Sequence, residues 1–75
     1  MGKSRNTALM KKVAARIKQL REKRGITQEV FLNDTGINIG RIERAERDIS
    51  ITSLGNICSY LEISLKEFFK DFKEG

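Results

Sequence analysis

Apolar residues recur every three or four positions along most of the chain, which is the spacing of an α-helix rather than of a strand. The first such set is Leu9, Met10, Val13, Ala14, Ile17 and Leu20. Asn6 or Thr7 supplies an N-cap before it. Gly25 ends it, because a left-handed residue at a helix C-terminus carries little strain only for glycine. The pattern therefore predicts a helix over residues 7–24.

A short second helix and an isoleucine-centred third helix follow. Thr27 caps the second, which turns Val30, Phe31 and in part Leu32 inward and ends near Asn33, before the turn formers of residues 33–36. In the third helix, Ile39 and Ile42 share the inner face. Three polar residues spaced three apart make the opposite stripe: Asn38, Arg41 and Arg44.

Two further helices complete the chain. Ser50 caps the fourth, and Ser64 with Glu67 forms a capping box for the fifth. Their apolar sets are Ile51, Leu54, Ile57, Cys58 and Leu61, and then Leu65, Phe68, Phe69 and Phe72. No alternating strand pattern is present. We expect an all-α fold of five helices in one domain, residues 7–75, after a flexible basic tail at residues 1–6. The predicted core is Val13, Ile17, Leu20, Val30, Phe31, Ile39, Ile42, Leu54, Ile57, Cys58, Leu61, Leu65 and Phe68.

The composition narrows the chemistry. The chain has 75 residues, no histidine and one cysteine, so a disulfide framework and a multi-cysteine metal site are excluded. We find no nucleophile–base pattern, phosphate loop or metal set, and we expect neither an enzyme nor a cofactor. No window resembles a membrane span or a secretory signal. Cys58 lies in an apolar stretch and is expected to be a buried hydrophobe, and this use of cysteine fits a reducing compartment. Together, these observations predict a soluble, cytoplasmic protein.

Positive charge is concentrated at one end of the chain. Residues 1–24 hold nine basic residues and one acid, whereas acids outnumber bases in the remainder, and the total is +5. A basic end favours a polyanionic partner such as nucleic acid. A solvated lysine-rich helix face explains the charge equally well.

Four short stretches, taken in order, resemble the Cro and phage-repressor class of helix-turn-helix DNA-binding proteins. They are residues 17–29, 41–44, 50–54 and 61–68, which read IKQLREKRGITQE, RIER, SITSL and LEISLKEF. The resemblance runs from Val13 to Phe69. It implies a compact five-helix domain whose third helix enters the major groove of duplex DNA.

The expected DNA-contacting residues are Gln28, Thr35, Asn38, Arg41, Arg44 and Arg47. Gln28 lies at a helix N-terminus, where free amides favour a phosphate. Arg41 suits bidentate donation to guanine, and Asn38 suits adenine or a helix cap. The resemblance implies phosphate contacts for Arg44 and Arg47, although a solvated surface position is as compatible with either.

The resemblance also implies a structural ion pair and exposes a departure. Arg21 and Glu43 match a partly buried pair that joins the first and third helices. The interval from Gln28 to Glu43 is three residues shorter than usual for the family, which leaves two registers open. Either Thr35 caps a helix over residues 36–45, or Asn38 caps a stunted one from Ile39. The isoleucine spacing favours the first. Gly40 restores a close contact between the second and third helices, and Ala45 replaces the family's glycine.

Two functions fit this sequence. The leading one is a sequence-specific transcription regulator, a repressor that binds a palindromic operator in double-stranded DNA as a homodimer. The alternative is a protein-binding module, such as the antitoxin of a toxin–antitoxin pair, which uses the same fold. An exposed patch of Phe68, Phe69 and Phe72 would indicate either that module or a dimer surface.

Overall fold

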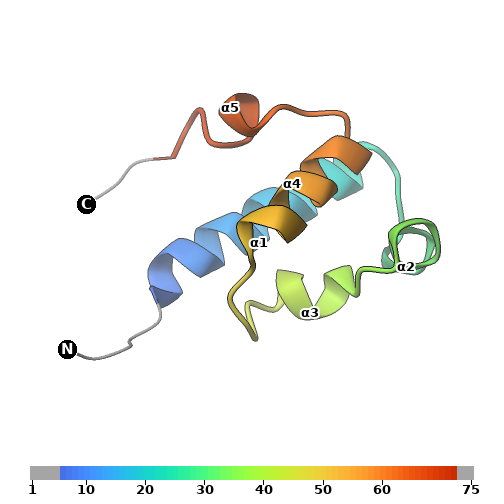
Figure 1. The fold of residues 1–75 in the computed structure, drawn as a ribbon, viewed down its shortest axis with the longest axis horizontal. Coiled ribbons are helices and arrows are strands. Elements are labelled where there is room, and N and C mark those ends of the chain that lie inside the picture. The colour runs from blue at the N-terminus through green and yellow to red at the C-terminus, as the bar shows by residue number, and fades with distance from the viewer. Residues whose placement is uncertain (1–5, 73–75) are drawn as a thin grey trace.

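The computed structural model describes residues 6–72 and contains five helices (Figure 1). They are α1 (Thr7–Lys23), α2 (Gln28–Thr35), α3 (Ile39–Glu43), α4 (Ile51–Tyr60) and α5 (Leu65–Phe68). No strand occurs within these residues, so the predicted all-α fold is confirmed. Of the basic tail expected at residues 1–6, all but Asn6 lies outside the described residues. No helix within the described range is both long and apolar enough to span a bilayer.

A short polar side chain caps each helix at its N-terminus. The five caps are Asn6, Thr27, Asn38, Ser50 and Ser64, and each accepts a hydrogen bond from the backbone N–H three residues further on. Such a cap satisfies one of the amides that a helix start leaves unpaired, and replacing it with alanine costs about 1 kcal/mol. Local chemistry therefore fixes where every helix begins.

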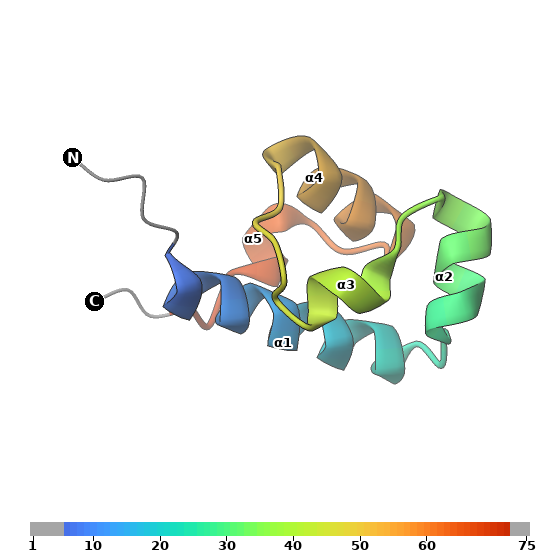
Figure 2. The same ribbon diagram turned by 90° about the horizontal axis from the view of Figure 1, so that it is seen from below.

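Figure 1 shows α1 and α4 between α5 on one side and α3 on the other, and Figure 2 shows that α4 and α1 lie on opposite sides of α3 and α5. The five largest fully buried side chains come from all five helices: Ile17, Phe31, Ile39, Ile57 and Phe68. Burying a side chain of this size contributes about 1.5–3 kcal/mol. Cys58 is also buried, as predicted, and burial raises the pKa of its thiol.

The core prediction is wrong for Val30 and Leu65, which are exposed, as Leu32 is. Leu65 is the first residue of α5, and Ile51, the first residue of α4, is 77% exposed. A side chain in the first turn has no preceding turn to lie against, so its spacing from later apolar residues does not make it face the core. Val30 immediately precedes buried Phe31 on α2 and is turned about 100° away from it.

Helix α2 is anchored to α4 by aromatic and polar contacts. The Phe31 and Tyr60 rings meet edge to face with centroids 4.8 Å apart. The Tyr60 hydroxyl donates a hydrogen bond to the Asp34 carboxylate, which raises the pKa of Tyr60. These contacts hold α2 against α4, although α2 is only about two turns long.

The favoured register of the third helix is wrong, and the stunted alternative is correct. Thr35 is the last residue of α2, which extends past the predicted end at Asn33. Gly36 then adopts φ +77°, a left-handed conformation that ends α2 and cannot start another right-handed helix. Asn38 caps α3 at Ile39, so the missing turn is lost from α3 itself.

Candidate nucleic-acid interface

The turn between α2 and α3 is closed by the Thr35 hydroxyl. It donates to the Phe31 carbonyl at 2.7 Å and accepts from the Ile37 N–H at 3.0 Å. The hydroxyl is thus already used within the turn. Thr35 therefore ties the end of α2 to the turn, and its hydroxyl has one acceptor lone pair left for any outside partner.

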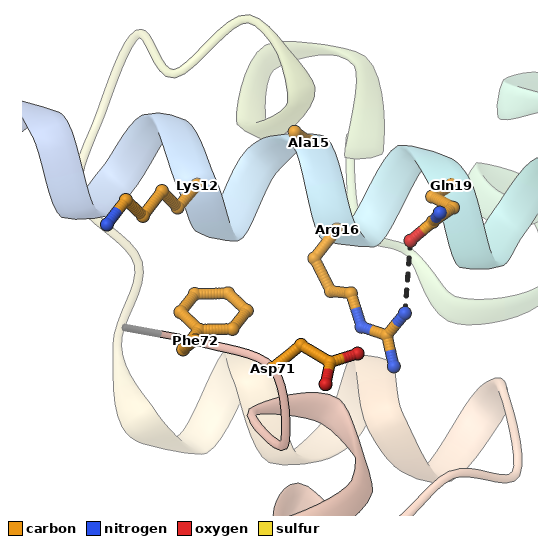
Figure 3. A pocket seen from close by; sticks show the side chains of 6 residues that line it. All are labelled: Lys12, Ala15, Arg16, Gln19, Asp71 and Phe72. Carbon is orange, nitrogen blue, oxygen red and sulfur yellow. Dashed lines mark hydrogen bonds between the residues drawn. The ribbon is translucent and has the colours of Figure 1, made fainter. Parts of the chain in front are cut away.

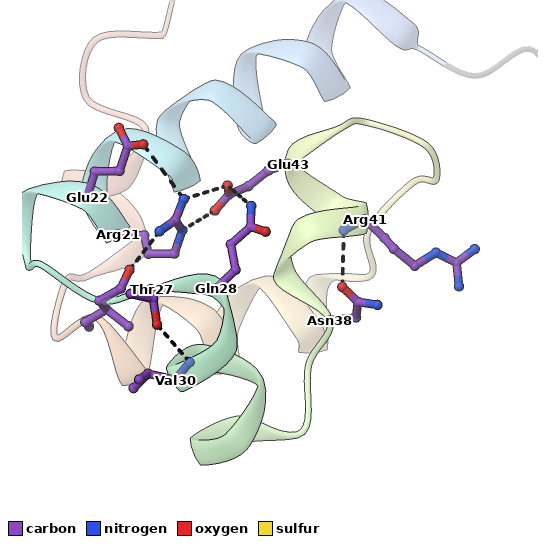
Figure 4. A network of polar contacts seen from close by, with 9 residues as sticks. Arg21, Glu22, Thr27, Gln28, Val30, Asn38, Arg41 and Glu43 are labelled. Carbon is purple, nitrogen blue, oxygen red and sulfur yellow. Dashed lines mark hydrogen bonds and ion pairs between the residues drawn. The ribbon is translucent and has the colours of Figure 1, made fainter.

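The inner face of α3 is fixed by packing and by an enclosed ion pair (Figure 4). Ile39 is fully buried, and Glu43 receives two parallel hydrogen bonds from Arg21: Nε to Oε2 at 2.7 Å and Nη2 to Oε1 at 3.0 Å. The remaining Arg21 amino group donates to the Ile26 carbonyl at 2.7 Å. Hydrogen bonding to Glu43 raises the pKa of Arg21, while burial opposes the rise. The pair expected between Arg21 and Glu43 is therefore present.

Gln28 closes this network from α2. Its Nε2 donates to Glu43 Oε1 at 3.0 Å, so the side chain lies against α3 (Figure 4). Gly40 makes this approach feasible, since a Cβ there would lie 3.0 Å from Gln28 Oε1 and 3.5 Å from an Arg44 amino group. Gln28 and Arg44 thus flank the same glycine. One Nε2 hydrogen of Gln28 remains for an outside acceptor.

The outer face of α3 presents arginines to solvent. Arg41 and Arg44 are both exposed, and the Arg41 side chain points away from the body of the domain (Figure 4). Asn38 Oδ1 accepts from the Arg41 N–H at 3.4 Å, so capping occupies that oxygen and leaves the Asn38 amide hydrogens. Beside Arg41, a hollow of about 210 Å³ is lined by Arg47 and by Ser50 and Ser53 of the α4 N-terminus. The structure thus brings Asn38, Arg41, Arg44 and Arg47 onto one side of α3.

Glu46 is the residue of this surface that the sequence analysis missed. Its carboxylate pairs with the Nε atoms of both Arg41, at 3.6 Å, and Arg44. The hydrogen bond from Arg44 and the nearby arginine charges hold the pKa of Glu46 below its usual value. In the sequence, Glu46 lies two residues after Arg44 and five residues after Arg41. This spacing predicts a contact only when it is known that the chain turns back after α3.

Other arginines near the basic end serve the fold. Arg16 donates to the carbonyls of Phe68 and Glu67 at 3.0 and 3.1 Å and to Gln19 at 3.0 Å, which ties α5 to α1. This contact borders a hollow of about 640 Å³ that Lys12 and Phe72 also line (Figure 3). It lies on the α5 side, away from α3. Phe68 is buried and Phe69 and Phe72 are half-buried on one another, so these three do not form an exposed patch.

Two short helices joined by a tight turn, with the second packed on its inner side and polar on its outer side, define a helix-turn-helix domain. A family model described as helix-turn-helix matches residues 17–68, more than half of the chain. The chain belongs to the Cro and phage-repressor-type helix-turn-helix family, and it is a DNA-binding transcription regulator. Searches of curated proteins and of solved structures returned no match.

Proposed function

We propose that the protein is a sequence-specific repressor that acts in the cytoplasm as a homodimer on a palindromic operator. The observation that carries the proposal is the contrast between the faces of α3. Its inner face is fixed by Ile39 and the Arg21–Glu43 pair, and its outer face presents the free ends of Arg41 and Arg44. A helix held rigidly on one side directs the polar residues on its other side into a groove.

Each predicted contact has a chemical role in this proposal. Arg41, midway along the outer stripe, donates to the O6 and N7 acceptors of guanine. Asn38 contributes its amide hydrogens, because its oxygen caps α3. Gln28 and Arg44, on either side of Gly40, and Arg47 beyond the helix donate to phosphates. Thr35 holds the turn that aligns them.

Dimer formation follows from the small size of the reading element. Helix α3 has five residues, and one short helix in one groove reads only a few base pairs. Two copies with their third helices about 34 Å apart, one turn of DNA, make a site long enough to be specific.

A protein-binding module remains the second candidate because of one apolar surface. Exposed Ile51 borders a hollow of about 350 Å³ between the start of α1 and the start of α4, lined by Leu9, Met10 and Phe69. This surface suits either a second copy or a different protein chain, such as a toxin. Sedimentation of the purified chain at micromolar concentration separates the two. A monomer that binds no duplex with sequence preference would favour the protein-binding module.

The direct test is selection of bound duplexes from a random-sequence pool at two salt concentrations. We expect a palindromic consensus with half-sites 10–10.5 base pairs apart, centre to centre. Specific enrichment should persist at the higher salt, where binding to random sequence weakens most. Recovery of a pool without a consensus would contradict sequence-specific regulation, and a single asymmetric half-site would contradict the homodimer.

A further inference from the structure

Glu46 is held beside Arg41 and Arg44 by the way α3 ends. Ala45 has φ +56°, and its N–H bonds to the Ile42 carbonyl at 2.9 Å. The Glu46 N–H bonds back to the Arg41 carbonyl at 3.3 Å. These two bonds are those of a Schellman motif, which reverses the chain over the last turn of the helix. The reversal returns Glu46 to the outer face of α3 instead of carrying it away from the helix.

The Glu46 carboxylate contacts both arginines at their Nε atoms. Oε1 pairs with Arg41 Nε and Oε2 with Arg44 Nε. A guanidinium has five donor hydrogens, of which Nε carries one. Among residues 6–72, each arginine therefore keeps its four terminal N–H donors free for an outside acceptor. Glu46 constrains the two side chains without occupying the ends that recognise DNA.

We infer that Glu46 is a specificity-determining residue, which orients Arg41 and disfavours its use as a phosphate clamp. This inference rests on the DNA-reading function proposed above. Binding to random DNA depends on phosphates, whose negative charge repels a carboxylate held between the two arginines. A guanine edge is uncharged and offers two fixed acceptors. Glu46 thus opposes every complex made through phosphates more than one in which Arg41 reads a base.

The chain offers a matched control on the other side of the domain. Glu67 pairs with Lys70 at 3.0 Å and is exposed to a similar degree, but it belongs to α5, on the opposite side of α1 and α4 from α3 (Figure 1). Glu46→Gln and Glu67→Gln change the net charge of the protein equally. Only Glu46→Gln releases the two arginines of α3.

The test measures binding of the wild-type chain and both variants to the selected duplex and to a scrambled duplex over a range of salt. For Glu46→Gln we expect binding to the scrambled duplex to tighten by about fivefold at 0.2 M salt, with a salt slope steeper by about one, as one more phosphate contact requires. Affinity for the selected duplex should stay within about twofold of wild type, so the specificity ratio falls. Glu67→Gln should leave this ratio unchanged.

The inference is overturned if Glu46→Gln changes both affinities by one common factor, or if it matches Glu67→Gln on both duplexes. A wild-type chain that does not prefer the selected duplex overturns the proposed function, and the inference with it. Circular dichroism melting curves accompany each variant. Since Glu46 is exposed, a variant that melts like wild type but loses the ratio supports the assignment.

Discussion

Arginine–glutamate pairs lie against both the inner and the outer face of α3, in opposite surroundings. On the inner face, the Arg21 and Glu43 side chains are 8% and 4% exposed, and each of the three guanidinium nitrogens of Arg21 donates a hydrogen bond. On the outer face, the side chains of Arg41, Arg44 and Glu46 are 46%, 59% and 43% exposed. The guanidinium groups of Arg41 and Arg44 are exposed to solvent.

This difference separates a structural ion pair from an exchangeable one. An enclosed pair cannot lose one member without leaving the other charge desolvated, which is costly. An exposed pair contributes about 0–1 kcal/mol, and solvent or another anion replaces it readily. The inner pair therefore fixes the orientation of α3. The outer pairs leave the terminal N–H donors of Arg41 and Arg44 accessible to a base or a phosphate.

The largest expected effect comes from breaking the inner pair. Arg21→Ala should lower the free energy of unfolding by about 3–5 kcal/mol, because Glu43 is left buried without its counter-charge. Thermal or urea denaturation measures this directly. The matched exposed variant Arg41→Ala should cost less than about 1 kcal/mol of stability. An unchanged melting temperature for Arg21→Ala would remove its structural role.

The next effect concerns DNA readout by the outer face. Arg41→Ala should cost about 1–3 kcal/mol of discrimination at one base position in each half-site, with little loss of binding to random duplex. Arg44→Ala should weaken binding to selected and random duplexes alike and reduce the salt slope by about one. Titrations with both duplexes distinguish the two variants. Equal losses on both duplexes for Arg41→Ala would make it a phosphate clamp and move readout to residues 36–38.

A smaller effect tests how α3 ends. Ala45 has φ +56°, where a residue other than glycine carries strain, so Ala45→Gly should raise the free energy of unfolding by about 1 kcal/mol. Glu62→Gly is the control, since Glu62 has φ +58° after α4 and is exposed. Urea denaturation of both variants checks this. A loss of stability for Ala45→Gly alone would mean that packing of its methyl group outweighs the strain.

The features predicted correctly from the sequence depend on chemistry within a few residues. The caps at Thr27, Ser50 and Ser64 are polar side chains that satisfy the amides of the next turn. Helix α1 is long enough for its apolar spacing to define one face, and Ile17 is fully buried as expected. The Arg21–Glu43 pair was accessible through the family resemblance.

The features that escaped prediction depend on backbone geometry and on very short helices. Helix α5 is a single turn, which is too short for the spacing of its apolar residues to define a buried face. The prediction that Leu65 lies in the core is therefore wrong. The register of α3 depends on the left-handed Gly36, which was expected inside the third helix. Glu46 is not predicted because Ala45 is a poor left-handed residue, so that only its place at the family's glycine position indicates a chain reversal.

The most direct test of the contrast between the faces follows the arginine Nε–Hε resonances by NMR while the selected duplex is added. The Arg21 Nε lies 2.7 Å from Glu43 Oε2, so its Hε proton should exchange slowly with water and keep its chemical shift when the duplex is added. The Arg41 and Arg44 Hε protons, which face the exposed Glu46, should exchange faster than that of Arg21, and their resonances should shift when the neighbouring terminal N–H groups bind DNA. Two results would contradict the division between a structural inner face and a DNA-reading outer face. One is rapid exchange of the Arg21 Hε, and the other is unchanged Arg41 and Arg44 chemical shifts after the duplex is added.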